Sequence, residues 1–165
     1  MAGSDEIRAL ATQVLAACQT RNLMIATAES CTGGLVAAAL TDIPGSSAVV
    51  ERGFVTYSNE AKAEMLAVPM ALIDVNGAVS EPVARAMAEG ALANSHADLA
   101  VSITGIAGPG GGSDEKPEGL VHFACARHGA LTSHARIDFG PLGRDRVRAA
   151  SVKLALTMLL NAAEG

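Results

Sequence analysis

Apolar residues follow two different spacings along this chain, which predicts a protein built from both helices and strands. Near the start, Ser4 and the two acidic residues after it are typical of a helix N-terminus. Apolar side chains then recur three or four residues apart, at Ile7, Leu10, Ala11, Val14 and Cys18. This spacing predicts a first helix that ends at about Thr20.

Five apolar runs have the length and composition of strands. They lie at residues 23–28, 49–57, 99–104, 120–127 and 131–139. Arg52 and Gly53 interrupt the second run, where we expect a bulge or a junction between two strands. His128 and Gly129 leave only a short connection between the last two runs, which predicts an antiparallel hairpin.

Four more helices are predicted between and after these runs. An alanine-rich stretch covers residues 35–40, a capped helix covers residues 58–66, and another starts at Ser80. The last helix begins after Pro141 and has one face formed by Val147, Ser151, Leu154 and Met158. The alternation of strands and helices favours an α/β fold, a three-layer α/β/α sandwich with a mixed, mostly parallel sheet. We expect residues 1–165 to form a single domain.

Composition argues for a small-molecule partner rather than a nucleic acid. Half of the 165 residues are hydrophobic but only 2% are aromatic, so the core has to be aliphatic. The net charge is -5 at pH 7, and no run of lysines and arginines is interleaved with aromatic residues. Nucleic-acid binders usually carry such basic stretches because they contact phosphates.

The cysteines and the N-terminal sequence indicate a reducing, cytoplasmic setting. Cys18, Cys31 and Cys125 form an odd set without CxxC spacing, which argues against a disulfide framework and against a zinc site. The four histidines show no metal-ligand spacing, so we expect no metal and no cofactor. The sequence has no basic leader and no apolar stretch of about 18 to 20 residues, so we expect a cytoplasmic protein without a membrane partner.

A candidate nucleophile lies at the turn between the first predicted strand and the helix that follows. The turn consists of Glu29, Ser30, Cys31, Thr32, Gly33 and Gly34. In open α/β sheets, side chains and free backbone N–H groups meet at such turns, so a serine here would face oxyanion donors. The alternative is that Ser30 or Thr32 only caps the helix. The turn is not a G-x-S-x-G elbow and no His/Asp pair completes a triad, so a serine nucleophile needs another base.

Lys62 is the candidate base, and Cys31 is a rival nucleophile. Lys62 follows Tyr57 and Ser58 at a strand-to-helix junction, and a desolvated lysine can lose its proton near neutral pH. The alternative is a solvated surface lysine, since nothing in the spacing brings Lys62 near Ser30. Cys31 lies where a helix N-terminus lowers the pKa of a thiol, although a small buried thiol is the more common case.

Two further segments could bind an anionic group. The glycine-rich run at residues 104–113 follows a predicted strand and could cradle a phosphate, but it matches neither a P-loop nor a dinucleotide-binding motif. Arg144 and Arg148 lie four residues apart at the predicted start of the last helix, where the helix dipole disfavours cations. A bound anion would relieve this conflict. The alternative is a solvated basic turn that Asp145 partly neutralises.

Four segments together resemble the CinA C-terminal-domain family. They are AESCTGG at 28–34, YSNEAK at 57–62, VSEPVA at 79–84, and TGIAGP at 104–109 with Lys116 and Pro117 after it. The resemblance covers nearly the whole chain. Members of this family include nicotinamide-mononucleotide deamidases, which release nicotinate mononucleotide and ammonia in pyridine-nucleotide (NAD) salvage. The resemblance therefore implies a metal-independent α/β/α amidohydrolase that forms homo-oligomers, dimers or larger, and acts on a small-molecule pyridine nucleotide.

Carried over residue by residue, the resemblance implies catalytic roles for Ser30, Lys62 and Tyr57. In the implied Ser/Lys acyl-enzyme mechanism, Lys62 deprotonates Ser30, and Tyr57 either relays a proton or orients Lys62. The substrate-binding residues that it implies are Cys31, Thr32, Gly33, Gly34, Thr104, Gly105, Gly110, Gly111, Arg144 and Arg148. Glu118 departs from the family pattern, in which an apolar residue is usual.

Two functions of other kinds stay open at this point. One is a non-catalytic nucleotide-binding regulatory module, and the other is a thiol amidase that uses Cys31 as its nucleophile. The presence of both Ser30 and Lys62 argues against the first of these.

Overall fold

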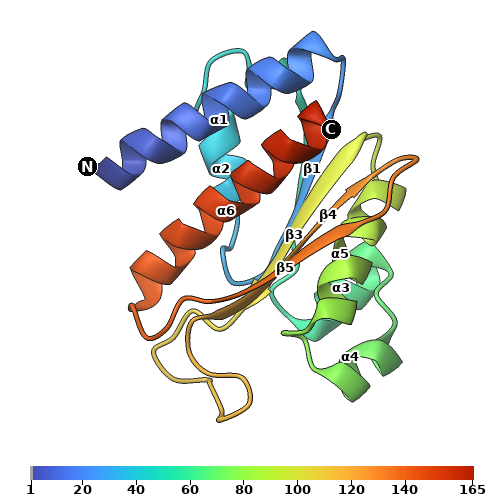
Figure 1. Cartoon of the computed structure of the whole chain (residues 1–165). Helices are drawn as coiled ribbons and strands as arrows, with labels where there is room; N and C mark the ends of the chain where they lie inside the picture. The colour runs from blue at the N-terminus through green and yellow to red at the C-terminus, as the bar shows by residue number, and fades with distance from the viewer. Residues whose placement is uncertain (1) are drawn as a thin grey trace.

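A five-stranded sheet lies between two layers of helices (Figure 1). The computed structural model describes residues 2–165. One face of the sheet carries the helices α1 (Ala2–Thr20), α2 (Leu35–Thr41) and α6 (Arg144–Glu164). The other face carries α3 (Asn59–Leu66), α4 (Met70–Asn76) and α5 (Glu81–Ala93). The predicted three-layer α/β/α sandwich is confirmed.

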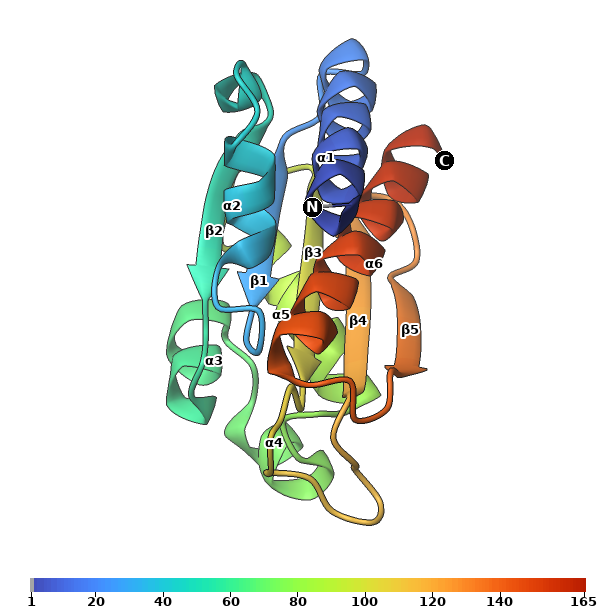
Figure 2. The same ribbon diagram turned by 90° about the vertical axis from the view of Figure 1, so that its left-hand side faces the viewer.

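The sheet is mixed, and its order is β2-β1-β3-β4-β5 (Figure 2). Its strands are β1 (Ile25–Glu29), β2 (Val50–Val55), β3 (Leu99–Gly105), β4 (Leu120–Arg127) and β5 (Ser133–Asp138). β1 pairs in parallel with both β2 and β3, whereas β4 is antiparallel to both β3 and β5. Every strand except β4 therefore runs in the same direction, as the prediction of a mostly parallel sheet requires. The predicted hairpin is the β4–β5 pair.

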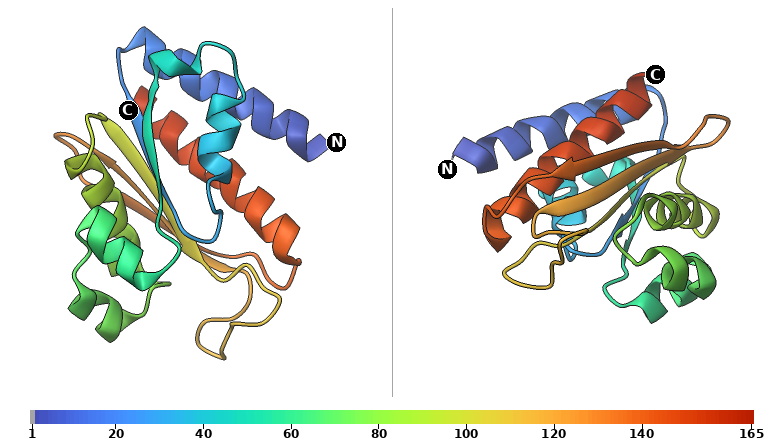
Figure 3. Two further views of the ribbon diagram at one scale, coloured as in Figure 1. Left: turned by 180° about the vertical axis from the view of Figure 1, so that it is seen from behind. Right: turned by 60° about the horizontal axis from the view of Figure 1, so that its bottom comes forward.

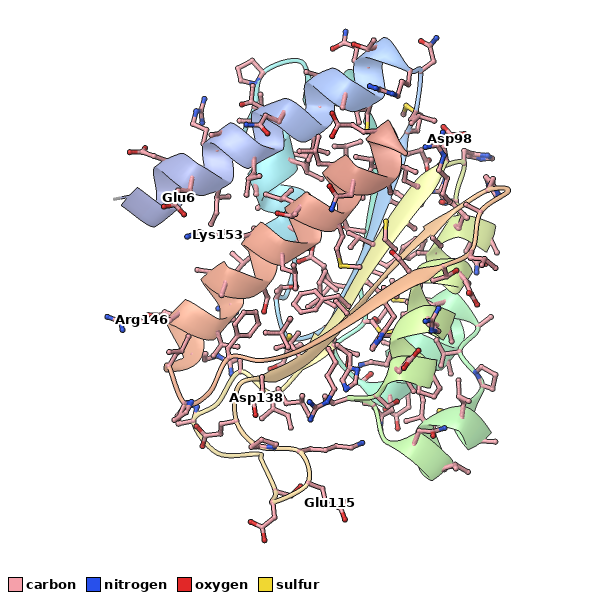
Figure 4. All side chains as sticks on the ribbon, viewed as in Figure 1. Glu6, Asp98, Glu115, Asp138, Arg146 and Lys153 are labelled. Atoms are coloured by element: carbon pink, nitrogen blue, oxygen red, sulfur yellow. The ribbon has the colours of Figure 1, made fainter. Side chains whose placement is uncertain are left out.

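Two mostly aliphatic clusters form the core, one on each face of the sheet. The cluster under α1 and α6 contains larger side chains of the sheet, such as Ile25, Val101 and Phe123. The cluster under α5 contains small ones, including Ala28 and Ala124. Small side chains on this face let a helix approach the sheet closely, which is how an alanine-rich chain with few aromatic residues fills its interior. In the helix layer formed by α1, α2 and α6, Lys153 of α6 forms an ion pair with Glu6 of α1 at 2.6 Å (Figure 4).

The structure differs from the sequence prediction in several segments, and the first helix begins at Ala2 rather than at Ser4. The short helix α4 was not expected from the sequence, and Pro69 is its N-cap residue. The last strand begins at Ser133, and Leu131, expected inside it, is 97% exposed in the hairpin turn. The irregular register in β2 falls opposite the step from Ile25 to Ala26, beside the expected interruption, but the strand continues through it.

The carboxyl ends of β1 and β3 lie side by side, and this edge of the sheet gathers several loops. Glu29 at the end of β1 lies in register with Ile103 of β3 and with Val55 of β2. The loop at residues 106–119 and the first turn of α6 lie at the same end, next to each other in both views of Figure 3. The turn that holds Ser30 therefore opens where parallel strands of an α/β sheet usually place a ligand. Within residues 2–165, no helix combines the length and the apolar character that crossing a bilayer needs.

Candidate active site

The Ser30 turn is held in place by a buried carboxylate. Glu29 is fully buried, and its two side-chain oxygens accept hydrogen bonds from the backbone N–H groups of Val36 at 2.9 Å and Ala37 at 3.0 Å. The last residue of β1 thus satisfies donors in the first turn of α2, a role usually taken by a capping side chain next to the helix. Gly33 and Gly34 complete the turn with φ of 59° and 106°, which favour glycine.

Lys62 projects from α3 into the protein and reaches Ser30. The Ser58 hydroxyl caps α3 by accepting from the Ala61 N–H at 3.0 Å, which confirms the predicted start of this helix. Lys62 is 1% exposed, and its Nζ lies 3.0 Å from Ser30 Oγ and 2.8 Å from the Thr56 carbonyl oxygen. The alternative that the sequence left open, a solvated surface lysine at position 62, is therefore wrong.

The surroundings of Lys62 favour its neutral form. Its two hydrogen-bond partners are uncharged, and Lys62 makes no ion pair with any residue from 2 to 165. Burial therefore lowers the pKa of Lys62 below its ordinary value of 10.5, because removing the ammonium from water disfavours the charged state. A neutral amine can accept the hydroxyl proton of Ser30, so the pair has the geometry and the electrostatics of a nucleophile with its base.

A small cavity of about 240 Å³ opens in front of this pair. Its lining consists of Ser30, Cys31, Tyr57, Ala78, Val79, Thr104, Gly105, Ala107 and Arg144. Arg144 and Tyr57 meet at its exposed side, where an Arg144 Nη2 donates to the Tyr57 hydroxyl at 3.2 Å. The other Arg144 Nη donates to the Gly108 carbonyl at 3.0 Å, which ties the glycine-rich loop to the start of α6.

The structure brings part of the predicted glycine-rich segment to the cavity and leaves part of it outside. Thr104 and Gly105 lie in the lining, and the Thr104 hydroxyl donates to the Ala78 carbonyl at 2.9 Å. Gly110 and Gly111 lie farther out in the loop and do not line the cavity. The Gly110 N–H donates to the Glu118 carboxylate at 2.6 Å, so the unusual Glu118 holds this loop in shape.

The structure separates the two predicted arginines. Arg144 lines the cavity, whereas Arg148 donates to the backbone carbonyls of Cys31 at 3.2 Å and of Thr32 at 3.3 Å. Arg148 lines a different hollow, of about 500 Å³, between α1, α2 and α6. Thr32 is fully buried, and its hydroxyl has no hydrogen-bond partner among residues 2–165.

Cys31 lies in the lining beside Ser30, but its thiol is poorly suited to be the nucleophile. Burial raises the pKa of Cys31 to about 11 and outweighs the lowering effect of Arg148 and Lys62. The thiol is therefore protonated at neutral pH, and the thiolate is the reactive form. Cys18 and Cys125 are also free and buried. No group of three or more His, Cys, Asp or Glu side chains within residues 2–165 is placed to hold a metal ion.

Two contacts of the site were not expected from the sequence. The Thr56 carbonyl that accepts from Lys62 carries no side-chain signal, so a sequence cannot indicate it. Glu29 does leave a signal, because an acidic residue that ends a buried strand needs partners for its carboxylate.

The fold and the site together indicate the class of this protein. A mixed α/β/α sandwich carries a buried serine–lysine pair and a cavity at the carboxyl ends of parallel strands. A model of the CinA C-terminal domain matches residues 7–163, and the chain belongs to the CinA C-terminal-domain family.

Relatives with different names and lengths match this chain. The nicotinamide-nucleotide amidohydrolase PncC of Escherichia coli is 59% identical over 122 residues, which is 74% of this chain and 74% of that protein. A CinA-like protein of Mycobacterium marinum is 56% identical over 138 residues, 84% of this chain but only 32% of the relative. A CinA-like protein of Akkermansia muciniphila is 52% identical over 142 residues, and the match spans 86% of this chain and 34% of the relative. The chain thus spans about a third of the length of these two longer relatives.

Solved structures of the family share the whole fold. The competence/damage inducible protein CihA of Agrobacterium tumefaciens superposes with a TM-score of 0.94 at 51% identity, covering 97% of this chain and 96% of the other. A CinA superfamily protein of Klebsiella pneumoniae superposes with a TM-score of 0.90 at 37% identity, covering 96% of this chain and 98% of the other.

Proposed function

We propose that this chain is an amidohydrolase that hydrolyses the carboxamide of nicotinamide mononucleotide to give nicotinate mononucleotide and ammonia, in pyridine-nucleotide salvage. The observation that carries the proposal is the 3.0 Å contact between Lys62 Nζ and Ser30 Oγ, both buried, at the wall of a cavity. The name of the Escherichia coli relative supports the substrate class. Such a pair provides a nucleophile and a base for acyl transfer without a metal ion or a histidine.

In the proposed mechanism, Ser30 Oγ forms a bond to the carboxamide carbon as its proton passes to Lys62 Nζ. Backbone N–H groups around Cys31 to Gly34 stabilise the negative charge on the carbonyl oxygen. The C–N bond then breaks, and Lys62 returns the proton to the leaving nitrogen, which departs as ammonia. Water adds to the acyl-enzyme with its proton going to Lys62, and breaking of the ester bond returns that proton to Ser30.

The size of the cavity suggests which part of the substrate it encloses. Pockets that enclose a whole drug-sized ligand usually have about 300 to 1,000 Å³, and this cavity has about 240 Å³. We therefore propose that it holds the pyridine carboxamide against Thr104 and Gly105, with the phosphoribosyl group directed toward Arg144 and the loop that contains Gly110 and Gly111. Tyr57 shares a hydrogen bond with Arg144 rather than with Lys62, so it is better placed to orient the substrate end of the site.

The test is ammonia release by the purified chain from nicotinamide mononucleotide, its riboside and free nicotinamide. We expect the highest kcat/KM with the mononucleotide, because contacts to the distant phosphate can be used to orient the carboxamide. Replacing Arg144 by alanine should raise KM for the mononucleotide more than for the riboside. Equal kcat/KM values for the three compounds would contradict the proposed phosphate contact.

The resemblance also implies a homo-oligomer, a dimer or larger, and this stays a proposal. Light scattering of the purified chain measures its mass in solution directly.

A further inference from the structure

We propose that Glu118 is a specificity-determining residue of the amidase site: its carboxylate lies close enough to Arg144 to weaken the binding of a substrate phosphate there. This inference rests on the proposed function and deepens it, because it concerns the phosphate of the same substrate. It gives Glu118 an effect on binding in addition to its contact with the glycine-rich loop.

The carboxylate of Glu118 lies against the part of the loop that Arg144 contacts. One Glu118 oxygen accepts a hydrogen bond from the Gly110 N–H at 2.6 Å. The other is 2.8 Å from the position that a Cβ would take on Gly108. The carbonyl of the same Gly108 accepts from an Arg144 Nη at 3.0 Å. Glu118 and Arg144 therefore approach one glycine from two sides, and Arg144 lines the cavity in front of Ser30.

These contacts limit the distance between the two charges. A residue spans at most about 4 Å from its Cβ position to its carbonyl oxygen, so the Glu118 carboxylate lies within about 10 Å of the Arg144 guanidinium. Charges in water interact over about this distance at 0.1 M ionic strength. Glu118 does not line the cavity, so it acts on an anion at Arg144 through its charge and not through contact.

Neither charge is neutralised by a direct partner. The two acceptors of Arg144 are the Gly108 carbonyl and the Tyr57 hydroxyl, which are both uncharged. Within residues 2–165, neither Arg144 nor Glu118 forms an ion pair. A phosphate at the cavity is therefore attracted by Arg144 and repelled by Glu118. The Gly110 N–H, which the glycine-rich run could offer to a phosphate, is already bound to the Glu118 carboxylate.

Two glutamates of the same loop provide a matched comparison. Glu118→Gln removes the charge but keeps an oxygen that can accept from Gly110. Glu115→Gln makes the same change of charge at an exposed residue, which Figure 4 shows at the outer end of the loop, away from the sheet. Glu118→Met also lacks the charge and has a similar length, so it serves if Glu118→Gln does not fold. Circular dichroism and thermal unfolding show which variants fold.

Two readouts separate an effect of charge from a structural role. The first is KM for nicotinamide mononucleotide and for its riboside, which differ by the phosphate, at low and at high ionic strength. The second is the concentration of ribose 5-phosphate that halves the rate at which a fluorophosphonate labels Ser30, followed by intact mass. In the labelling reaction the Oγ–P bond forms, the P–F bond breaks, fluoride leaves, and the hydroxyl proton passes to Lys62. This second readout does not require the substrate to be a pyridine amide.

For Glu118→Gln we expect KM for the mononucleotide to fall about two- to tenfold at low ionic strength, because a like charge about 10 Å away is removed. KM for the riboside should change less than about twofold. The protecting concentration of ribose 5-phosphate should fall by a similar factor to that for the mononucleotide. Both effects should shrink in 1 M salt, where charges are screened within about 3 Å, whereas an effect of altered loop structure would persist. Glu115→Gln should match the unchanged protein.

An unchanged KM for the mononucleotide in the folded Glu118 variants would overturn the inference, and so would an equal fall in KM for the riboside. A fall of the same size in Glu115→Gln would also overturn it, because the net charge of the loop would then set the affinity. If the unchanged protein releases no ammonia from any pyridine amide, the proposed function fails. A lower protecting concentration of ribose 5-phosphate in Glu118→Gln would then still support the effect of Glu118 on an anion in the cavity, and an equal concentration would overturn it.

Discussion

At the scale of single residues, the site depends on a lysine that is buried without an ionic partner. Ser30 and Lys62 are 32 positions apart, and the sequence offers each of them as a candidate without indicating that they meet. Their contact results from the packing of α3 beside the end of β1, which residue spacing does not encode. Motif resemblance supplied the pairing, and the structure supplied the reason that Lys62 can act as a base, namely its burial between uncharged partners.

Burial of Lys62 should lower the free energy of unfolding, while it makes the amine reactive as a base. The pKa of Lys62 is lowered in the folded state, so on acidification the unfolded chain binds this proton first and folding is opposed below about pH 10.5. We expect Lys62→Met to be inactive but more stable at pH 7, by about 1 kcal/mol in urea unfolding, because the desolvated amine is removed. Its two lost hydrogen bonds involve only neutral acceptors. The stability difference should shrink above pH 10.5, and a Lys62→Met protein less stable than the parent at pH 7 would contradict this account. Lys153→Met is the contrasting variant, because it removes a lysine that pairs with Glu6 at 2.6 Å and should therefore not stabilise the fold.

Cys31 and Ser30 occupy adjacent positions in the cavity wall but should differ in their importance. The raised pKa of Cys31, about 11, leaves the thiol protonated at neutral pH. We therefore expect Cys31→Ala to keep kcat within about tenfold of the parent, and Ser30→Ala to lose turnover. Steady-state ammonia release measures both. The reverse pattern would favour the thiol-amidase alternative.

At the scale of secondary-structure elements, the capped helices and buried strands were predictable because their signals are local. Ser58 and Ser80 mark the starts of α3 and α5, as expected. The short helix α4 was not predictable, because seven residues after a proline carry too little periodicity. Glu29 links two elements, because its carboxylate at the end of β1 accepts hydrogen bonds from N–H groups in the first turn of α2. Such a contact between elements has no local signal in the sequence.

The packing of α3 on α5 should control the position of Lys62. A Cβ at Gly90 of α5 would overlap the Leu66 carbonyl oxygen at the end of α3. Alanine is favoured over glycine by about 1 kcal/mol within a helix, yet we expect Gly90→Ala to destabilise the fold by about 2 kcal/mol and to lower kcat, because α3 has to move. Urea unfolding and ammonia release measure these effects.

Gly3 of α1 is the matched control for this substitution. A Cβ at Gly3 would lie 3.9 Å from its nearest neighbour, Lys153 Nζ, so Gly3→Ala should be neutral or stabilising. A Gly90→Ala protein as stable and as active as Gly3→Ala would show that the contact between α3 and α5 does not hold the base in place.

At the scale of the whole molecule, the class of fold follows from the alternation of strands and helices, but the order of the strands does not. The order β2-β1-β3-β4-β5 places β1 at the centre of the parallel part of the sheet, and the turn after it therefore meets β3, α3 and α6. This arrangement brings together residues from positions 30, 62, 104 and 144. It also separates Arg144 from Arg148, which lie on one helix and look equivalent in the sequence. That residues 1–165 act as a single amidohydrolase domain stays a prediction.

The most direct test of the central claim is the rate of ammonia release from nicotinamide mononucleotide by folded Lys62→Arg protein, measured beside the parent chain. Arginine keeps the positive charge and approximate length, but it cannot lose its proton in the usable pH range. The account predicts that Lys62→Arg is as inactive as Ser30→Ala, while kcat/KM of the parent rises with pH through an ionisation below 10.5, because the neutral amine is the active form. Near-normal turnover by Lys62→Arg would contradict the Ser30–Lys62 mechanism, even if deamidation itself were observed.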